Sequence, residues 1–314
     1  MSSLDSTAEY EFKKQLTYGC HAKIDGYGTS YGYVPSLAAG IVFCVLFAGV
    51  EEDLVVRCLR SWMYQYANPS YKSPLQPYAN SAITAEILGW AARTWSAECP
   101  YNGTAFLMQI STLIIAPTFF TAGIYVLLGR FIHLLGPETS ILRPKLYLWI
   151  FVTCDIISLV VQAVGGGMAS MEVNKVNGDT APGTHTMVAG IVFQLASITV
   201  FVFLAADFVR RTLRMRILQT MTGTIIPLLG AMIFSVICIY IRSIYRTIEL
   251  SQGWSGYLIT HERYFIVLDG IMMVLAVGVF NIFHPGWLLP KNEVKPFHRE
   301  IYSPDGVASG MEMR

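Results

Sequence analysis

Acidic side chains interrupt several long apolar stretches of this sequence, where charged groups are rare. An ionisable side chain within a bilayer is costly, so such residues mark either a functional site or a structural ion pair. Carboxylates at this depth can guide a cation or relay protons, and they suit a long-chain amine whose ammonium pairs with acids while its tail stays in lipid. The residues that form this predicted polar path are Glu86, Asp155, Gln162, Glu262 and Asp269.

One apolar stretch, Leu146 to Ala169, carries its polar and small residues on a single helical face. Steps of three or four residues repeat along that face, so the helix has a polar stripe that must face protein or water rather than lipid. At 1.5 Å per residue, Asp155 lies roughly 14 Å from the inner end of this helix, near the middle of the bilayer. The stripe comprises Asp155, Ser158, Gln162, Gly166 and Ala169.

Basic residues on other stretches offer partners for these acids. Arg242, Arg246 and Glu249 share one face of a helix, and Glu262 and Asp269 are seven residues apart on the next one. One interpretation is an ion-pair lock between these two helices, because buried charges demand partners. The other is a polar path in which the arginines are counter-charges or headgroup contacts. The sequence leaves both interpretations open, and Arg93 is a further counter-charge in either.

Three consecutive glycines, Gly165, Gly166 and Gly167, lie near the outer end of the same stretch as Asp155. Small residues permit close contact between membrane helices, and glycine also ends helices. Packing or termination is therefore one interpretation. A hinge beside a substrate path is the other.

The composition requires a membrane to position these residues. Hydrophobic residues make up 54% of the 314 residues and charged residues only 14%, against roughly a quarter charged in soluble domains. A bilayer core needs roughly 20 apolar residues per span, and the backbone must satisfy its hydrogen bonds within a helix. The sequence therefore predicts an all-α integral membrane protein. Its clear spans are Val34–Val50, Thr104–Leu128, Leu146–Ala169, Thr186–Ala206, Thr224–Ile241 and Tyr264–Phe283.

A seventh candidate span, Ser81–Ala97, contains Glu86 and Arg93, each of which costs about 2.5 to 3.5 kcal/mol at a helix centre. With seven spans, fourteen Lys and Arg residues lie on the side of the C-terminus and seven on the other side, which predicts a cytoplasmic C-terminus. A six-span arrangement gives nearly the same bias, so charge leaves the N-terminus open. Cys20 and Cys99 share the oxidising outer side, and can pair, only if there are seven spans.

Several function classes lack their motifs. The sequence contains no GxxxxGK[ST], so it predicts no ATPase of its own, and no HExxH that would hold zinc. The last span carries no lysine for a retinal Schiff base. We therefore expect a protein that is not an enzyme, with no metal, no cofactor and no nucleic-acid partner. Its expected partners are membrane lipids and an amphipathic lipid substrate. The sequence does not determine the oligomeric state.

From about Tyr31 to Gly286 the chain resembles the fungal lipid-translocating exporter family, seven-span proteins that include an aminosterol-resistance protein and a sphingoid long-chain-base exporter. The resemblance implies that Ser81–Ala97 is a genuine span, that the N-terminus lies outside and that Cys20 faces Cys99. It also implies the movement of amphipathic lipids, with long-chain bases as the best-known class. The motifs that carry it are YVPS at 33–36, EILGWAAR at 86–93, IIAPTFFTAGIYVLLGR at 114–130, DIISLVVQAVGGG at 155–167, the series Arg242, Arg246, Glu249 and Gly253, ERYFIVLD at 262–269 and HPG at 284–286.

Taken together, we expect seven transmembrane helices in a multi-pass plasma-membrane protein. Residues 1–33 are expected to be extracellular, 34–283 to form the membrane domain and 284–314 to be a disordered cytoplasmic tail. The expected activity is export of amphipathic lipids, such as sphingoid long-chain bases, from the cytoplasmic leaflet outward, in connection with stress resistance. The alternative is a seven-helix receptor or sensor of the lipid or stress state of the membrane.

Overall fold

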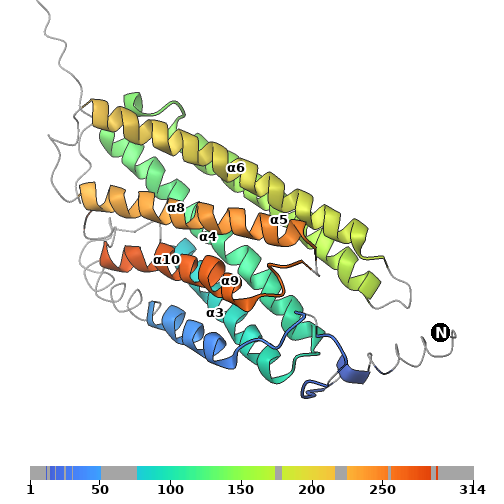
Figure 1. Cartoon of the computed structure of the whole chain (residues 1–314). Helices are drawn as coiled ribbons and strands as arrows, with labels where there is room; N and C mark the ends of the chain where they lie inside the picture. Colours follow the sequence, from blue (N-terminus) through green and yellow to red (C-terminus); the bar gives the residue numbers. More distant parts are fainter. Residues whose placement is uncertain are drawn as a thin grey trace, which may run out of the picture.

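The computed structural model describes residues 12, 15–17, 19–24, 26–29, 31–50, 76–173, 179–215, 225–253, 256–283 and 288. All regular structure in these residues is helical. A helix at Leu37–Val50 precedes the elements labelled in Figure 1. Those elements are α3 (Gln76–Glu98), α4 (Gly103–Leu135), the 3₁₀ turn η1 (Pro137–Thr139), α5 (Pro144–Val173), α6 (Ala181–Arg214), α8 (Ile225–Ser251), α9 (Glu262–Phe265), the π-helical segment η2 (Ile266–Ile271) and α10 (Met272–Ile282).

Five helices are long and apolar enough to cross a bilayer: α4, α5, α6, α8 and the continuous rod that α9, η2 and α10 form. The protein is therefore a multi-pass membrane protein, as its composition predicts. These helices extend past the apolar runs found in the sequence. The predicted span Thr186–Ala206, for example, lies within α6, whose ends carry polar residues that still gain the helical hydrogen bonds.

The candidate span Ser81–Ala97 lies within α3, a helix of 23 residues whose length is about 35 Å at 1.5 Å per residue. Its hydropathy is too low to identify it as a span, yet it packs along α4 as closely as the apolar helices pack on one another. Glu86 lies near the midpoint of α3, which begins five residues before the predicted span.

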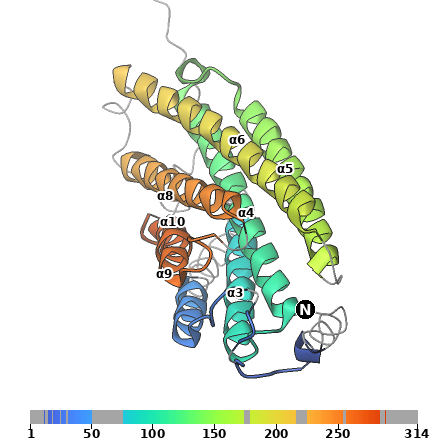
Figure 2. The ribbon, with the colours of Figure 1, turned by 45° about the vertical axis from the view of Figure 1, so that its right-hand side comes forward.

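The helices form one bundle with α4 at its centre. Figures 1 and 2 show α5 and α6 running side by side on one side of α4, with α3 along another side. The helix α8 lies between α6 and α10. In Figure 2 the helix 37–50 stands beside α9 and α10. This arrangement brings α3, α8 and the α9–α10 rod together, and these three elements carry the arginines and most of the buried acids.

The contact between α5 and α6 depends on glycine. A Cβ added to Gly165 would lie 2.5 Å from the backbone nitrogen of Met187, and one added to Gly183 would lie 2.5 Å from the nitrogen of Ala169. Any larger side chain would force the two backbones apart. Small residues four positions apart are a common basis of close packing between membrane helices.

Of packing and termination, the two roles in the first interpretation of the glycine triplet, the structure shows packing. Helix α5 continues through all three glycines to Val173, because the contact with α6 holds this region in the helical conformation. The packing role belongs to Gly165. A Cβ on Gly166 or Gly167 would meet no atom within 4 Å.

The N-terminal segment is fastened to the C-terminal end of α3 and the N-terminal part of α4. A disulfide joins Cys20 to Cys99, whose Cα atoms are 4.7 Å apart. The Tyr31 hydroxyl is hydrogen-bonded to Ser96 Oγ at 3.0 Å and to Gln109 Oε1 at 2.6 Å. Burial raises the pKa of Tyr31 to about 12, so its phenol stays neutral and keeps donating. The predicted tail 284–314 lies outside the described residues, apart from Leu288.

Candidate functional site

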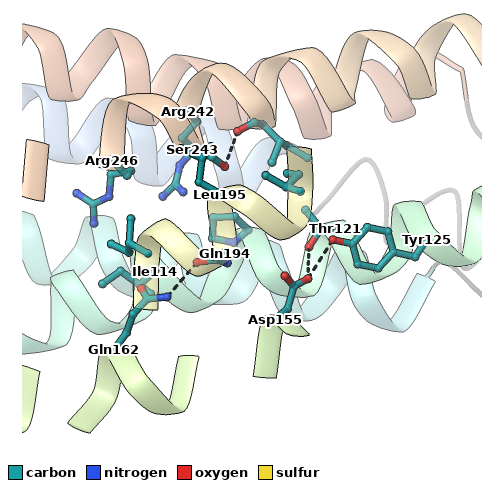
Figure 3. Close-up of a pocket in the computed structure, with 14 residues that line it drawn as sticks. Ile114, Thr121, Tyr125, Asp155, Gln162, Gln194, Leu195, Arg242, Ser243 and Arg246 are labelled. Atoms are coloured by element: carbon teal, nitrogen blue, oxygen red, sulfur yellow. Dashed lines mark hydrogen bonds between the residues drawn. The ribbon is translucent and has the colours of Figure 1, made fainter. Parts of the chain in front are cut away.

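Asp155 lies in the interior of the bundle and is only 2% exposed. Its Oδ2 accepts hydrogen bonds from the Tyr125 hydroxyl at 3.1 Å and the Thr121 hydroxyl at 3.4 Å, both on α4 (Figure 3). Among the described residues no cation pairs with it. A carboxylate held by neutral hydroxyls alone, deep in a bundle, keeps the capacity to bind a positive group.

A cavity of about 40 Å³ separates Asp155 from the arginines of α8. This volume is room for a few water molecules. Four helices, α4, α5, α6 and α8, supply its walls, and Figure 3 shows the acid on one side with the guanidinium groups across from it. The polar residues that line it are Thr121, Tyr125, Asp155, Gln162, Gln194, Arg242, Ser243 and Arg246. We name this space the Asp155 cavity.

Two glutamines form the floor of the Asp155 cavity. Gln162 Nε2 donates to Ser158 Oγ at 2.8 Å and lies 3.0 Å from Gln194 Oε1 on α6, while Gln194 Nε2 donates to Thr118 at 3.2 Å. The Gln162 oxygen accepts no hydrogen bond from the described residues. The polar stripe of α5 therefore faces protein and the cavity, and it leaves a free acceptor there.

Arg242 lies beside the turn of α4 that contains Pro117. Proline has no N–H, so the carbonyl of Leu113, four residues earlier, loses its helical partner. Arg242 Nη2 donates to this carbonyl at 2.7 Å. A side chain of the neighbouring helix α8 thus satisfies the freed carbonyl, and this hydrogen bond holds Arg242 against α4.

The same arginine belongs to a network of ion pairs. Arg242 Nη2 lies 3.0 Å from Asp269 Oδ1, and Arg246 Nε lies 3.5 Å from the same oxygen. Arg246 also pairs with Glu249 at 2.7 Å, and Tyr245 donates to Glu249 at 2.9 Å. Asp269 is fully buried. The α8 arginines thus bridge to the α9–α10 rod.

Glu262 pairs with a different helix from the one that the sequence suggests. Its Oε1 lies 2.8 Å from Arg93 Nη2 of α3 and accepts the backbone N–H of Ser36 at 2.8 Å. The lock between the last two long helices therefore includes Asp269 but not Glu262. The reason is that α9 lies beside the C-terminal part of α3, which carries Arg93. Arg93 also donates to Tyr33, and its guanidinium lies 4.5 Å from the centroid of the Phe265 ring.

We name the six paired residues of this region the paired cluster. Its three acids and three arginines balance in charge, and all but Glu262 are buried. Ion pairs between buried groups of opposite charge favour a structural role, although the Asp269 oxygens lie at ion-pair distance without meeting hydrogen-bonding geometry. The paired cluster comprises Arg93, Arg242, Arg246, Glu249, Glu262 and Asp269.

A π-helical segment, Ile266–Ile271, presents Asp269 to the arginines. Such segments widen the turn by one residue and are frequent at functional sites. The next residue, Gly270, is tightly enclosed, since an added Cβ would lie 2.7 Å from Trp90 and 2.8 Å from Phe43. The placement of Glu262 and Asp269 on one helical face assumed an ordinary α-helix between them. The π-helical segment breaks that period, so the seven-residue spacing did not predict that the two acids have different partners.

A second cavity, of about 30 Å³, lies beside the N-terminal segment. Its lining includes Tyr31, Tyr33, Arg93, Gln109 and Arg246. Arg246 lines both cavities and therefore lies between this cavity and the Asp155 cavity. A discontinuous polar seam thus runs from the N-terminal segment to Asp155.

Sequence reasoning missed the neutral partners in these sites. Tyr125 and Thr121 are the donors to Asp155, and Tyr33 is a partner of Arg93. Gln194 completes the cavity floor. A polar amide within the apolar run of α6 was a visible signal for Gln194. Tyr125 carried no such signal, because tyrosine is common in apolar helices.

The fold and the site define a helical, multi-pass membrane protein with a buried polar seam inside its bundle. The family model for RTA1-like proteins matches residues 80–292. The chain belongs to this family. No solved structure matches it.

Three relatives in Saccharomyces cerevisiae match most of the chain, and the names of two of them concern transport. The chain is 36% identical to the sphingoid long-chain base transporter RSB1 over 291 residues, which cover 82% of this chain and 73% of that protein. It is 29% identical to protein RTA1 over 277 residues, covering 81% and 84%. It is 28% identical to protoporphyrin uptake protein 1 over 283 residues, covering 80% and 90%. The likeness to RSB1 indicates lipid transport as the general activity.

Proposed function

We propose that the protein is a seven-span exporter of amphipathic amines, such as sphingoid long-chain bases, in the plasma membrane. The helix 37–50 and α3 join the five apolar spans in this proposal. The N-terminus then lies outside with the Cys20–Cys99 disulfide in an oxidising environment, and the C-terminus is cytoplasmic. The protein acts without an ATPase of its own and is not an enzyme. The likeness to RSB1, which is named a sphingoid long-chain base transporter, supports amphipathic amines as the substrate class.

One observation carries the proposal: Asp155 is a buried carboxylate that lines a polar cavity and has no cationic partner among the described residues. The ammonium of a long-chain base would supply the missing charge. Its hydroxyl groups would meet the Gln162 acceptor and the glutamine floor. The arginines across the cavity already belong to the paired cluster, so they do not compete for Asp155.

The tail of such a substrate has an apolar surface close at hand. Ile156, Val160 and Val164 on α5 are about half exposed, and in a membrane these side chains face lipid. A headgroup at Asp155 would therefore leave its chain within the acyl region beside α5. The cavity has room for only a few water molecules, so substrate entry requires the α5–α6 pair to move relative to α4 and α8.

The test is reconstitution of purified protein into liposomes with a fluorescent sphingoid base, with movement between leaflets followed by quenching from outside. Wild-type protein is expected to accelerate movement, and Asp155→Asn to reduce the rate by about thirtyfold or more, since loss of one member of a buried charge pair costs about 2 to 5 kcal/mol. Asp207→Asn is the matched control, because Asp207 forms a partly exposed pair with Arg211 on α6.

Equal rates for Asp155→Asn and wild type would refute the site. No acceleration by folded wild-type protein would refute the transport function itself. Ligand-dependent recruitment of a partner protein without lipid movement would replace it with a sensor.

A further inference from the structure

A fourth acid in the region of the paired cluster has no arginine of its own. Glu86, on α3, is 0% exposed, and neither of its oxygens accepts a hydrogen bond from the described residues. Trp90, one turn further along α3, lies near it without reaching hydrogen-bonding geometry. The acids of the region therefore outnumber the arginines by one, and Glu86 is the surplus member.

The groups around Glu86 come from each helix that packs against α3. Arg242 and Arg246 of α8 and Asp269 of η2 interact electrostatically with Glu86. On the helix 37–50, Cys44 lies near the carbonyl of Ile87. Helix α4 contributes apolar and hydroxyl groups beside Gly89, including Leu113, and no charged group within the described residues at that level.

The charge balance of this region favours the protonated form of Glu86. Arg93, Arg242 and Arg246 are neutralised by the three acids of the paired cluster. An ionised Glu86 would add one uncompensated negative charge in a dry site, which is very unfavourable. The structure is therefore neutral here only when Glu86 holds a proton.

Arg242 connects Glu86 to the substrate cavity. It lines the Asp155 cavity and also interacts electrostatically with Glu86. A cation bound at Asp155 repels Arg242 and Arg246, which favours their movement toward Asp269 and Glu86. Ionisation of Glu86 stabilises the arginines in that position. Binding of a cation and release of a proton therefore favour each other, and this coupling is reciprocal.

We propose that Glu86 is a proton-binding site through which export of one ammonium headgroup is exchanged for entry of one proton. The Glu86 carboxylic acid loses its proton to the cytoplasmic side as the cation binds, and its carboxylate takes up a proton from the outer side after the cation has left. Each cycle moves one positive charge outward and one inward, so no net charge crosses. This inference rests on the transport function proposed above.

The test uses the full chain in liposomes with a pH-sensitive dye trapped inside and an N,N,N-trimethyl sphingoid base as the probe. The quaternary nitrogen cannot carry a proton across the bilayer, which removes the pH change that ordinary amines cause by themselves. In a one-for-one exchange, a pH difference of one unit drives about tenfold accumulation of the probe, because both correspond to about 1.4 kcal/mol. Wild-type protein is expected to show this accumulation, with a proton signal that follows the probe.

The Glu86→Gln variant is expected to lose both the accumulation and the proton signal. Glu86→Asp keeps a carboxylate and is expected to retain coupling, and Glu138→Gln, at an exposed position of η1, is the neutral control. Probe movement by wild type without proton movement would overturn the exchange while leaving the transport function intact. Full accumulation by Glu86→Gln would overturn the assignment to this residue. No probe movement by wild type, together with no movement of the fluorescent sphingoid base, would instead count against the transport function.

Discussion

The paired cluster and the Asp155 cavity both contain a carboxylate that is almost completely buried, but the two carboxylates have different kinds of partner. In the paired cluster, Asp269 lies within ion-pair distance of both Arg242 and Arg246. In the Asp155 cavity, the acid receives only the hydroxyls of Tyr125 and Thr121. Buried charges that have partners hold helices together, and a buried charge without one is available to a ligand. The comparison predicts that substitutions in the two regions affect different properties.

The largest expected loss of stability comes from Asp269→Asn. Removal of one partner from a buried ion pair costs about 3 to 5 kcal/mol, since the remaining charge is left uncompensated. Here Arg242 loses its acid, so we expect a marked fall in the temperature of unfolding in detergent. The double variant Asp269→Asn with Arg242→Met removes both charges and is expected to recover part of the loss. A single variant as stable as wild type would contradict the structural role of the paired cluster.

The outer boundary of the paired cluster depends on the N-terminal segment, where Ser36 and Tyr33 contact Glu262 and Arg93. Cys20→Ser removes the disulfide that fastens this segment across a separation of 79 residues. Loss of such a link costs about 2 to 4 kcal/mol. The expected outcome is faster proteolysis of the N-terminal segment in intact cells and a lower unfolding temperature. Cys44→Ser, at a free cysteine, is the control and is expected to change neither.

A smaller effect is expected at the glycine contact that sets the position of α5 and of Asp155 with it. Gly165→Leu places a side chain against the backbone of Met187, and overpacking costs about 1 to 3 kcal/mol. Gly166→Leu is the matched control, because an added Cβ there meets nothing within 4 Å. Thermal unfolding in detergent distinguishes them. Equal unfolding temperatures for the two variants would show that α5 and α6 do not require the close contact.

The sequence was sufficient for the parts of the molecule that follow from local pattern. Apolar runs predicted the helical spans, and the stripe on α5 placed Asp155 and Gln162 inside the bundle, because a helix has a fixed period. The freed carbonyl at Pro117 also followed from covalent structure alone. These inferences need no knowledge of which helices are neighbours.

The remaining features depend on tertiary packing. The partner of Glu262 could not be inferred, because nothing in the spacing says that α9 lies beside α3 rather than α8. The π-helical turn at Asp269 breaks the period on which the face assignment relied. The excess of one acid, Glu86, becomes apparent only when the acids and arginines of several helices are counted together. In the sequence, Glu86 is simply another acidic residue within a membrane span.

The smallest change in stability is expected for Asp155→Asn, and this prediction sharpens the comparison most. The asparagine oxygen can still accept from Tyr125 and Thr121, and no cation is left unpaired by the substitution. Removal of a buried charge that has no counter-charge also relieves its desolvation cost. We therefore expect a change below about 1 kcal/mol in the free energy of unfolding, toward greater stability if any. A fall as large as that of Asp269→Asn would mean that Asp155 is structural, whereas an intact fold combined with lost lipid movement would separate a ligand site from the ion pairs that surround it.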